Sequence, residues 1–350
     1  MVVFYHAANH MRQNIGYLPL GGVAQFGHAG VDFFFVLSGF IIYYVHGKDM
    51  NNHRRLLNYV ERRFTRIYPL YWFVIIFALM LDLMFAKSLK SDILTIVGSA
   101  TLFPTLRDPY IGVAWTLQHE VIFYSIFAIG IVNYRLGWSV FSVWLMAIIV
   151  NWGFVDVNPQ NGLMHKILSF YSLEFFFGIF AAWVTLKMQK SSKLNLDRSE
   201  NNRSEYTKYK LLLMIGMLIF LTFGIAENKD MYEINSIYAR LGYGLSSMMM
   251  VIGLAGLREV KNRKVSEILG VLGSASFSIY LTHLIFIGIT YKIFEMTGLF
   301  ASLYVWVTYL LLSFSGIFGG IIISKFIEHP LTDLTRIYIS RVKLLTREIP

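Results

Sequence analysis

Nine apolar stretches, separated by shorter polar segments, restrict the fold of this chain of 350 residues more than any other feature. Hydrophobic residues make up 56% of the sequence and charged residues 15%, whereas roughly a quarter of the residues in a soluble domain are charged. Apolar runs that cross a bilayer must satisfy their backbone polar groups internally, so they fold as helices. We predict an all-α polytopic transmembrane helix bundle with nine full spans after a truncated first helix. The predicted spans are 30–45, 68–85, 111–132, 137–152, 168–186, 211–226, 237–257, 272–291 and 300–323.

The basic residues are distributed unevenly between the two ends of these spans. If the basic connector 48–66 faces the cytoplasm, alternation places 23 of the 31 Lys and Arg residues on the cytoplasmic side and 7 outside, with Arg240 inside a span. This asymmetry is the positive-inside pattern of membrane proteins. It explains the net charge of +10 without a nucleic-acid partner, so we expect membrane lipids as the surroundings. The basic loops and the C-terminus are predicted to be cytoplasmic.

The sequence predicts a single integral-membrane domain over 1–350, since neither a fixed repeat nor a separate soluble domain is visible. The connector 48–66 has the basic amphipathic pattern of a helix that lies at the membrane interface. Segment 187–210 is charged and rich in Ser and Asn, which predicts a mobile cytoplasmic linker. Segment 325–350 predicts a basic amphipathic cytoplasmic tail. Because the chain has no cysteine, disulfides, thiol nucleophiles and zinc–thiolate sites are excluded, and we expect no metal.

A carboxyl group inside the predicted span 111–132 requires a physical reason. Glu120 lies roughly 13 Å from the start of that run, close to the middle of a hydrocarbon layer about 30 Å thick. An acidic residue at that depth costs roughly 2.5–3.5 kcal/mol on insertion scales, and it usually faces a bundle interior or a wet cavity. Glu120 is therefore a candidate functional residue.

Other ionisable residues lie in the outer half of the predicted spans and predict a polar vestibule that opens away from the cytoplasm. Glu174 and Arg240 have opposite charges at similar depth, so we expect a structural ion pair between them. Asp32 either caps a helix start or contacts substrate. His119 is either a packed or a functional histidine, and His283 lies near the midplane beside Glu120.

Six short motifs follow one another in register with the predicted spans. They are VVFYH at 2–6, GVDFFFVLSGF at 30–40, RFTRIYPLYW at 63–72, WTLQHEVIFY at 115–124, SFSIYLTH at 276–283 and EHP at 328–330. Together they resemble the acyltransferase-three family of bacterial membrane O-acyltransferases, which acetylate O-antigen, exopolysaccharide and nodulation-factor sugars. The resemblance covers essentially the whole chain. It implies a multi-pass protein of the bacterial cytoplasmic (inner) membrane with about ten helices, acetyl-CoA as donor, and a glycan or lipid-linked sugar acceptor.

The family's catalytic motif is an arginine followed at fixed spacing by a histidine in the first helix. His6 matches that histidine, while the arginine would precede Met1, so we expect a truncated start. Histidine is suited to take a proton from a sugar hydroxyl near neutral pH, and formation of an acyl-histidine is the competing mechanism. A carboxylate can hold such a histidine in one tautomer, and Glu120 is the candidate partner of either His6 or His283.

Two further groups of residues are assigned by position within these motifs. Arg63, Arg66 and Tyr68 are placed to meet the phosphates of CoA, although the arginines could also anchor lipid headgroups. The candidate substrate-binding residues are Asp32, Trp115, His119 and Tyr124.

The sequence therefore predicts an O-acetyltransferase of a cell-surface or exported glycan. Acetyl or succinyl transfer, the sugar, the hydroxyl and the oligomeric state are left open. One alternative is a transporter or flippase, in which Glu120, Glu174, Arg240 and His283 would form a substrate or proton path. Another is a non-enzymatic assembly or sensing subunit.

Overall fold

The computed structural model of the protein describes residues 1–85, 91–104, 108–152, 162–194, 199–232, 236–257 and 262–347. Within these ranges the regular secondary structure is entirely helical, which confirms the predicted all-α helix bundle. Eight helices of the described chain are long and apolar enough to cross a membrane. A shorter apolar helix, Tyr134–Val150, lies at the position of the remaining predicted span.

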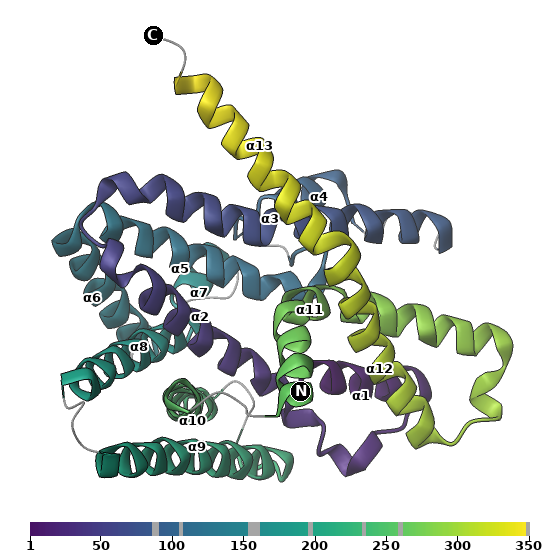
Figure 1. Cartoon of the computed structure of the whole chain (residues 1–350). Coiled ribbons are helices and arrows are strands. Elements are labelled where there is room, and N and C mark those ends of the chain that lie inside the picture. The colour runs from purple at the N-terminus through teal and green to yellow at the C-terminus, as the bar shows by residue number, and fades with distance from the viewer. Residues whose placement is uncertain are drawn as a thin grey trace. The chain divides into compact units, whose positions relative to one another are not determined.

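Each predicted span coincides with a helix that is labelled in Figure 1. In chain order these helices are α2 (Gly30–His46), α3 (Leu56–Phe85), α5 (Trp115–Val132), α6 (Tyr134–Val150), α8 (Tyr171–Leu194), α9 (Ser199–Asn228), α10 (Ile237–Gly256), α11 (Arg263–Thr297) and α12 (Val305–Ile323). The other helices are α1 (Val2–Ile15), α4 (Ile93–Ala100), α7 (Gly162–Ile167) and α13 (His329–Arg347).

The connector 48–66 does not form a separate interfacial helix, so that prediction is wrong. Two short 3-10 turns lead into α3, which continues without interruption through Pro69. Proline inside a helix removes one backbone hydrogen bond and usually kinks or ends it. Buried side chains on both sides of Pro69, among them Tyr59 and Leu70, pack α3 as one helix despite that loss.

The described part of segment 187–210 is also helical and not irregular. Helix α8 extends to Leu194 and α9 begins at Ser199, while residues 195–198 lie outside the described residues. Lys, Gln and Glu are good helix formers, so a polar composition does not by itself predict an irregular chain. The tail is helical too, because α13 occupies most of 325–350.

By internal contacts the chain divides into two compact units. The first unit comprises 1–5, 20–56 and 118–260. In it α2 packs on α8, and α10 packs on α2, α8 and α9; Figure 1 shows α10 end-on between α8 and α9. Helices α2 and α8 approach closely at Gly39 and Gly178, where an added Cβ would meet the backbone of the other helix.

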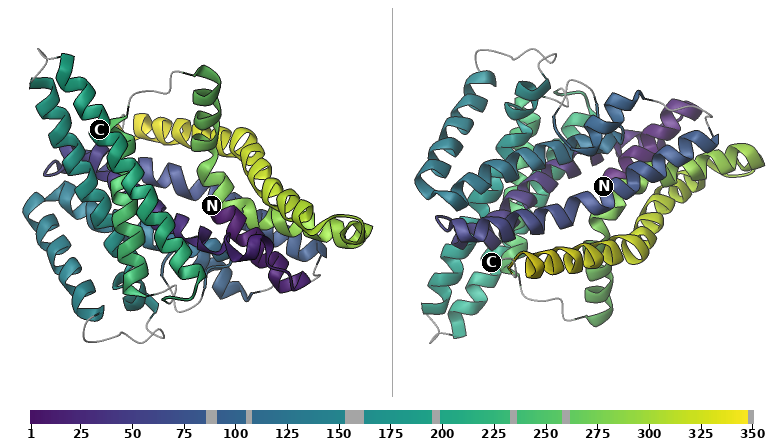
Figure 2. Two further views of the ribbon diagram at one scale, coloured as in Figure 1. Left: turned by 90° about the horizontal axis from the view of Figure 1, so that it is seen from below. Right: turned by 90° about the horizontal axis from the view of Figure 1, so that it is seen from above.

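The second unit comprises 6–19, 57–117 and 261–350. Helices α11 and α12 form a hairpin, yellow-green in Figures 1 and 2, and a π-helical turn at Ser324–Glu328 joins α12 to α13. Gly320 lets α12 lie directly against the backbone of α11. Because α11 also contacts side chains of α1 and α3, it is the helix around which this unit is organised.

Candidate functional site

A pair of histidines lies in the second unit where α1 meets α11. The ring centroids of His6 and His283 are 5.1 Å apart, with the ring planes tilted by 44°. One turn further along α1, the ring of His10 packs edge-on against Tyr291 of α11 at 4.7 Å. The structure therefore brings together two of the three residues predicted to be catalytic, although they are separated by most of the chain.

The hydrogen bonds of His283 define which of its ring nitrogens can accept a proton. Nδ1 donates to the backbone carbonyl of Tyr280 at 2.6 Å and lies 3.1 Å from the carbonyl of Ile279. Since a carbonyl oxygen can only accept, Nδ1 carries the hydrogen and Nε2 of the neutral ring carries the lone pair. Nε2 is buried and has no hydrogen-bond partner among the described residues.

Glu120 lies in the first unit, where hydroxyl groups hold its carboxylate. Its Oε1 accepts a 2.7 Å hydrogen bond from Ser38 of α2 and a short one from Tyr124, one turn along α5. The role predicted for Glu120, fixing the tautomer of a histidine, is filled for His283 by backbone carbonyls. Sequence reasoning missed Ser38, whose only signal was its position inside the motif at 30–40.

The predicted ion pair between Glu174 and Arg240 is wrong, because Arg240 of α10 pairs with Asp32 of α2. The distance from Nη1 to Oδ1 is 2.5 Å, and the two side chains are 3% and 0% exposed. The guanidinium also lies 4.8 Å from the centre of the Tyr171 ring. Glu174 is buried nearby, and neither of its carboxyl oxygens has a hydrogen-bond partner among the described residues. Depth along a span could not distinguish the two acids, since both lie in the outer half.

A second buried carboxylate of the first unit was not predicted. Glu227 of α9 lies 2.7 Å from Nε2 of His28 and accepts a 2.6 Å hydrogen bond from the Tyr243 hydroxyl. The predicted span 211–226 ends one residue before Glu227, so this residue is absent from the predicted intramembrane groups. The helix in fact continues to Asn228 and carries the carboxylate into the interior.

The arginines predicted to bind the donor lie in α3, in the second unit. Nη1 of Arg66 donates to Glu328 at 2.6 Å, and its guanidinium lies 5.0 Å from the centre of the Phe277 ring. Glu328 is 3% exposed and also accepts hydrogen bonds from Ser278 at 2.6 Å and Ser324 at 3.0 Å. The Arg66 side chain is 45% exposed, so its remaining N–H groups can contact a ligand.

The other predicted site residues occupy varied surroundings. The Tyr68 hydroxyl donates to the backbone carbonyl of Thr101 at 3.0 Å, and Tyr68 follows Arg66 by two residues on α3. His119 is buried against the rings of Phe35 and Tyr171 in the first unit. Trp115 is half-buried at the start of α5. Arg63 is half-buried on the same helix as Arg66.

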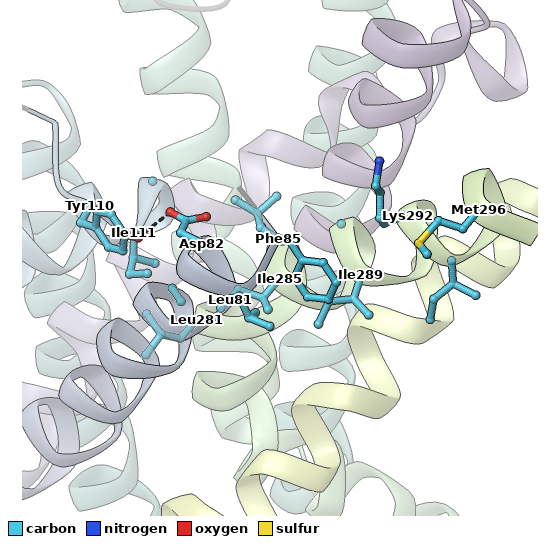
Figure 3. A pocket seen from close by; sticks show the side chains of 15 residues that line it. Leu81, Asp82, Phe85, Tyr110, Ile111, Leu281, Ile285, Ile289, Lys292 and Met296 are labelled. Atoms are coloured by element: carbon cyan, nitrogen blue, oxygen red, sulfur yellow. Dashed lines mark hydrogen bonds between the residues drawn. The ribbon is translucent and has the colours of Figure 1, made fainter. Parts of the chain in front are cut away.

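A cavity of about 510 Å³ lies within the second unit, between α3, residues 110–112 and α11 (Figure 3). The Tyr110 hydroxyl donates to Oδ2 of Asp82 at 2.6 Å at one end of it. Burial, together with this hydrogen bond, raises the pKa of Tyr110, so the hydroxyl stays protonated and keeps donating. The other end carries Lys292 and Met296.

Comparison with known proteins agrees with the motifs. A family model described as "Acyltransferase domain" matches residues 1–325. The chain is 27% identical over 281 residues to the "Exopolysaccharide production protein ExoZ" of Rhizobium meliloti (strain 1021). The match covers 76% of this chain and 78% of that protein. No solved structure matches the chain significantly. With the family model extending over nearly its whole length, this helical membrane protein belongs to the acyltransferase-three family.

Proposed function

We propose that the protein transfers an acetyl group from cytoplasmic acetyl-CoA to a hydroxyl group of an exported or cell-surface glycan. Membership of the acyltransferase family supports group transfer. The similarity to a protein named for exopolysaccharide production supports a glycan acceptor. The excess of Lys and Arg at one end of the spans supports a location in the bacterial inner membrane with the donor on the basic, cytoplasmic side.

The pairing of His6 with His283 is the observation that carries this proposal. Nε2 of His283 is buried, carries a lone pair and has no hydrogen-bond partner among the described residues. Such a nitrogen can act as a base or as a nucleophile. The backbone carbonyls at the other nitrogen keep the ring of His283 in this tautomer without a carboxylate.

The reaction can proceed by general base catalysis at this pair. An imidazole nitrogen takes the proton of the sugar hydroxyl while the hydroxyl oxygen attacks the thioester carbon. The carbon–sulfur bond then breaks, and the departing CoA sulfur takes the proton from the imidazolium. On the competing path the imidazole nitrogen of His6 attacks the thioester carbon, and the carbon–sulfur bond breaks to release CoA thiolate. The sugar oxygen then attacks the acyl carbon, the bond from that carbon to the imidazole nitrogen breaks, and the hydroxyl proton passes to the CoA thiolate. Both paths return the histidines to their starting state.

The remaining site residues have supporting roles in this proposal. Arg66 and Arg63, with Tyr68 on the same helix, bind the phosphates of acetyl-CoA, because a half-exposed guanidinium recognises phosphate by charge and hydrogen bonding. Glu120 stabilises the interior of the first unit by accepting hydrogen bonds from Ser38 and Tyr124. Trp115, which belongs to the same unit as the histidine pair, contributes to the acceptor side, while Asp32 and His119 support the packing of the first unit.

Transfer of radiolabelled acetyl from acetyl-CoA to exopolysaccharide fragments tests the proposal with purified protein in vesicles. Wild-type protein should label the glycan, and His6→Ala should lower the rate by about 10²–10⁴-fold. His10→Ala is the matched control, since it removes another ring that α1 packs on α11 and should transfer at a near-native rate. No labelled glycan from wild-type protein would overturn the function. Native transfer by His6→Ala would overturn the site.

A further inference from the structure

A short 3-10 turn in the first unit, η2 (Gln25–Ala29), lies between the first turn of α1 and the C-terminal part of α9. On one side Gly27 approaches α1 so closely that an added Cβ would lie 2.9 Å from the backbone oxygen of Met1 and 3.0 Å from the Cβ of Tyr5. On the other side the ring of Phe26 packs directly on a glycine of α9. Because groups packed this closely cannot shift independently, η2 sets the spacing between α1 and α9.

His28 adds a buried polar contact between η2 and α9. Its Nε2 lies 2.7 Å from Oε1 of Glu227, and the two side chains are 11% and 5% exposed. An ionised carboxylate can only accept, so Nε2 donates to Glu227. Hydrogen bonds to a charged group are stronger than those between neutral groups, and burial strengthens this one further. The bond therefore fastens η2 to α9 more firmly than packing alone.

The same imidazole ring also contacts α1. The ring centroids of His28 and Tyr5 are 5.7 Å apart and the ring planes differ by 70°, which is an edge-to-face arrangement. Tyr5 directly precedes His6 in α1, a single helix over Val2–Ile15. Since neighbouring residues of a helix share one regular backbone, a displacement of Tyr5 moves His6 with it. His28 thus links Glu227 to the turn of α1 that carries His6.

The position of His6 is the property that this link controls. The ring centroids of His6 and His283 are 5.1 Å apart, and a base must lie within about 2.6–3.2 Å of the proton that it removes. A displacement of about 1 Å, even one caused far from the reacting atoms, can lower a rate by about 10²-fold. The reaction therefore depends on the contacts that hold the first turn of α1.

We propose that His28 is a positioning residue, which through its bond to Glu227 holds the first turn of α1 and thereby keeps His6 beside His283. The inference rests on the proposed function, because it concerns the geometry of the histidines in that reaction. His28 takes no part in the bond-making steps. A carboxylate thus serves the reacting histidine indirectly, through a second histidine and the backbone of α1.

Glu227 accepts hydrogen bonds from two residues, which allows a matched comparison. Its Oε1 faces His28, and its Oε2 accepts a 2.6 Å hydrogen bond from the Tyr243 hydroxyl. His28→Leu and Tyr243→Phe each remove one donor from this buried carboxylate, so both variants lose stability. Only His28→Leu also releases η2 from α9, because Tyr243→Phe leaves the bond between His28 and Glu227 in place. His28→Gln restores the donor, since an amide N–H can replace the Nε2–H of the ring.

Steady-state kinetics of acetyl transfer in vesicles test this role. His28→Leu should lower kcat by about 10–100-fold because His6 is displaced, while the KM for acetyl-CoA stays within about twofold of wild type. Tyr243→Phe should keep kcat within about twofold of wild type, and His28→Gln should recover most of the lost rate. Equal losses of kcat in His28→Leu and Tyr243→Phe would overturn the proposal, because they would trace the effect to stability alone. A wild-type kcat in His28→Leu would also overturn it.

Hydrogen exchange followed by mass spectrometry measures the hold on α1 without the reaction. His28→Leu should speed the exchange of backbone amides in α1 by about tenfold or more, the effect of losing one charge-assisted hydrogen bond. Tyr243→Phe and His28→Gln should leave that exchange at the wild-type rate. Unchanged exchange of α1 in His28→Leu would overturn the proposal. If wild-type protein transfers no acetyl group, the proposed function fails, and the exchange of α1 still decides whether His28 holds this helix.

Discussion

Each unit holds an arginine paired with a buried carboxylate, but the two pairs differ in what the arginine can still do. In the first unit Arg240 is 3% exposed and closed in by Asp32 and aromatic rings. In the second unit Arg66 binds the equally buried Glu328 and remains 45% exposed. A buried arginine that pairs with a buried carboxylate supports the fold, whereas a half-exposed arginine keeps N–H groups that can bind a ligand. The same residue types therefore serve structure in one place and binding in the other.

The largest effect on stability is expected where the pair is fully buried. Asp32→Asn should lower the free energy of unfolding by about 3–5 kcal/mol, because it removes the charged carboxylate that pairs with the buried Arg240 guanidinium. Unfolding in detergent, followed by intrinsic fluorescence, measures this loss. The double variant Asp32→Asn with Arg240→Met should lose less than the two single variants together, and simple additivity would show that the pair is not coupled.

A smaller effect, on binding and not on folding, is expected at the half-exposed pair. Arg66→Met should raise KM for acetyl-CoA by about 10–100-fold, since charge-assisted hydrogen bonds contribute about 1.5–3 kcal/mol. The KM for the acetyl thioester of N-acetylcysteamine, which has no phosphates, should not change. Lys343→Met is the control, because it breaks another ion pair on α3, the 2.7 Å contact with Glu61. A rise in KM for both donors would instead indicate that Arg66 only supports the fold.

The smallest effect on stability is expected from removing one of the hydroxyl groups that donate to Glu120. Tyr124→Phe removes one hydroxyl donor from the buried Glu120 carboxylate and should cost about 1–2 kcal/mol of stability, because Ser38 still donates. The same unfolding assay measures it. The combination with Ser38→Ala should cost more than the sum of the two single changes, since it leaves the carboxylate without either hydroxyl. Strict additivity would mean that Glu120 does not depend on this pair of donors.

The spans were predictable because hydrophobicity along a chain directly reports the length that a helix must have in lipid. The family motifs named both His6 and His283 as candidates, but their contact was not predicted, since they lie at opposite ends of the sequence. The basic amphipathic pattern of 48–66 predicted a separate interfacial helix, but α3 runs from Leu56 to Phe85 as one helix, because buried side chains pack along its whole length.

The buried partners were the least predictable part of the site. Asp32 and Glu174 both lie at a depth similar to that of Arg240, so depth along a span cannot identify the ion-pair partner. The partner is Asp32 because of how α2, α8 and α10 are rotated about their axes. Glu227 was missed because its span was drawn two residues too short. Glu328 was seen as part of a motif, but its bond to Arg66 joins helices that are far apart in the sequence.

The central claim is that Nε2 of His283, next to His6, belongs to the reacting centre. His283→Asn tests it most directly, because the amide N–H can replace Nδ1–H at the carbonyls of Tyr280 and Ile279 while nothing replaces Nε2. The rate of acetyl transfer at saturating substrates should fall by about 10²–10⁴-fold with an unchanged unfolding temperature. Transfer at the wild-type rate by a stably folded His283→Asn variant would contradict the claim.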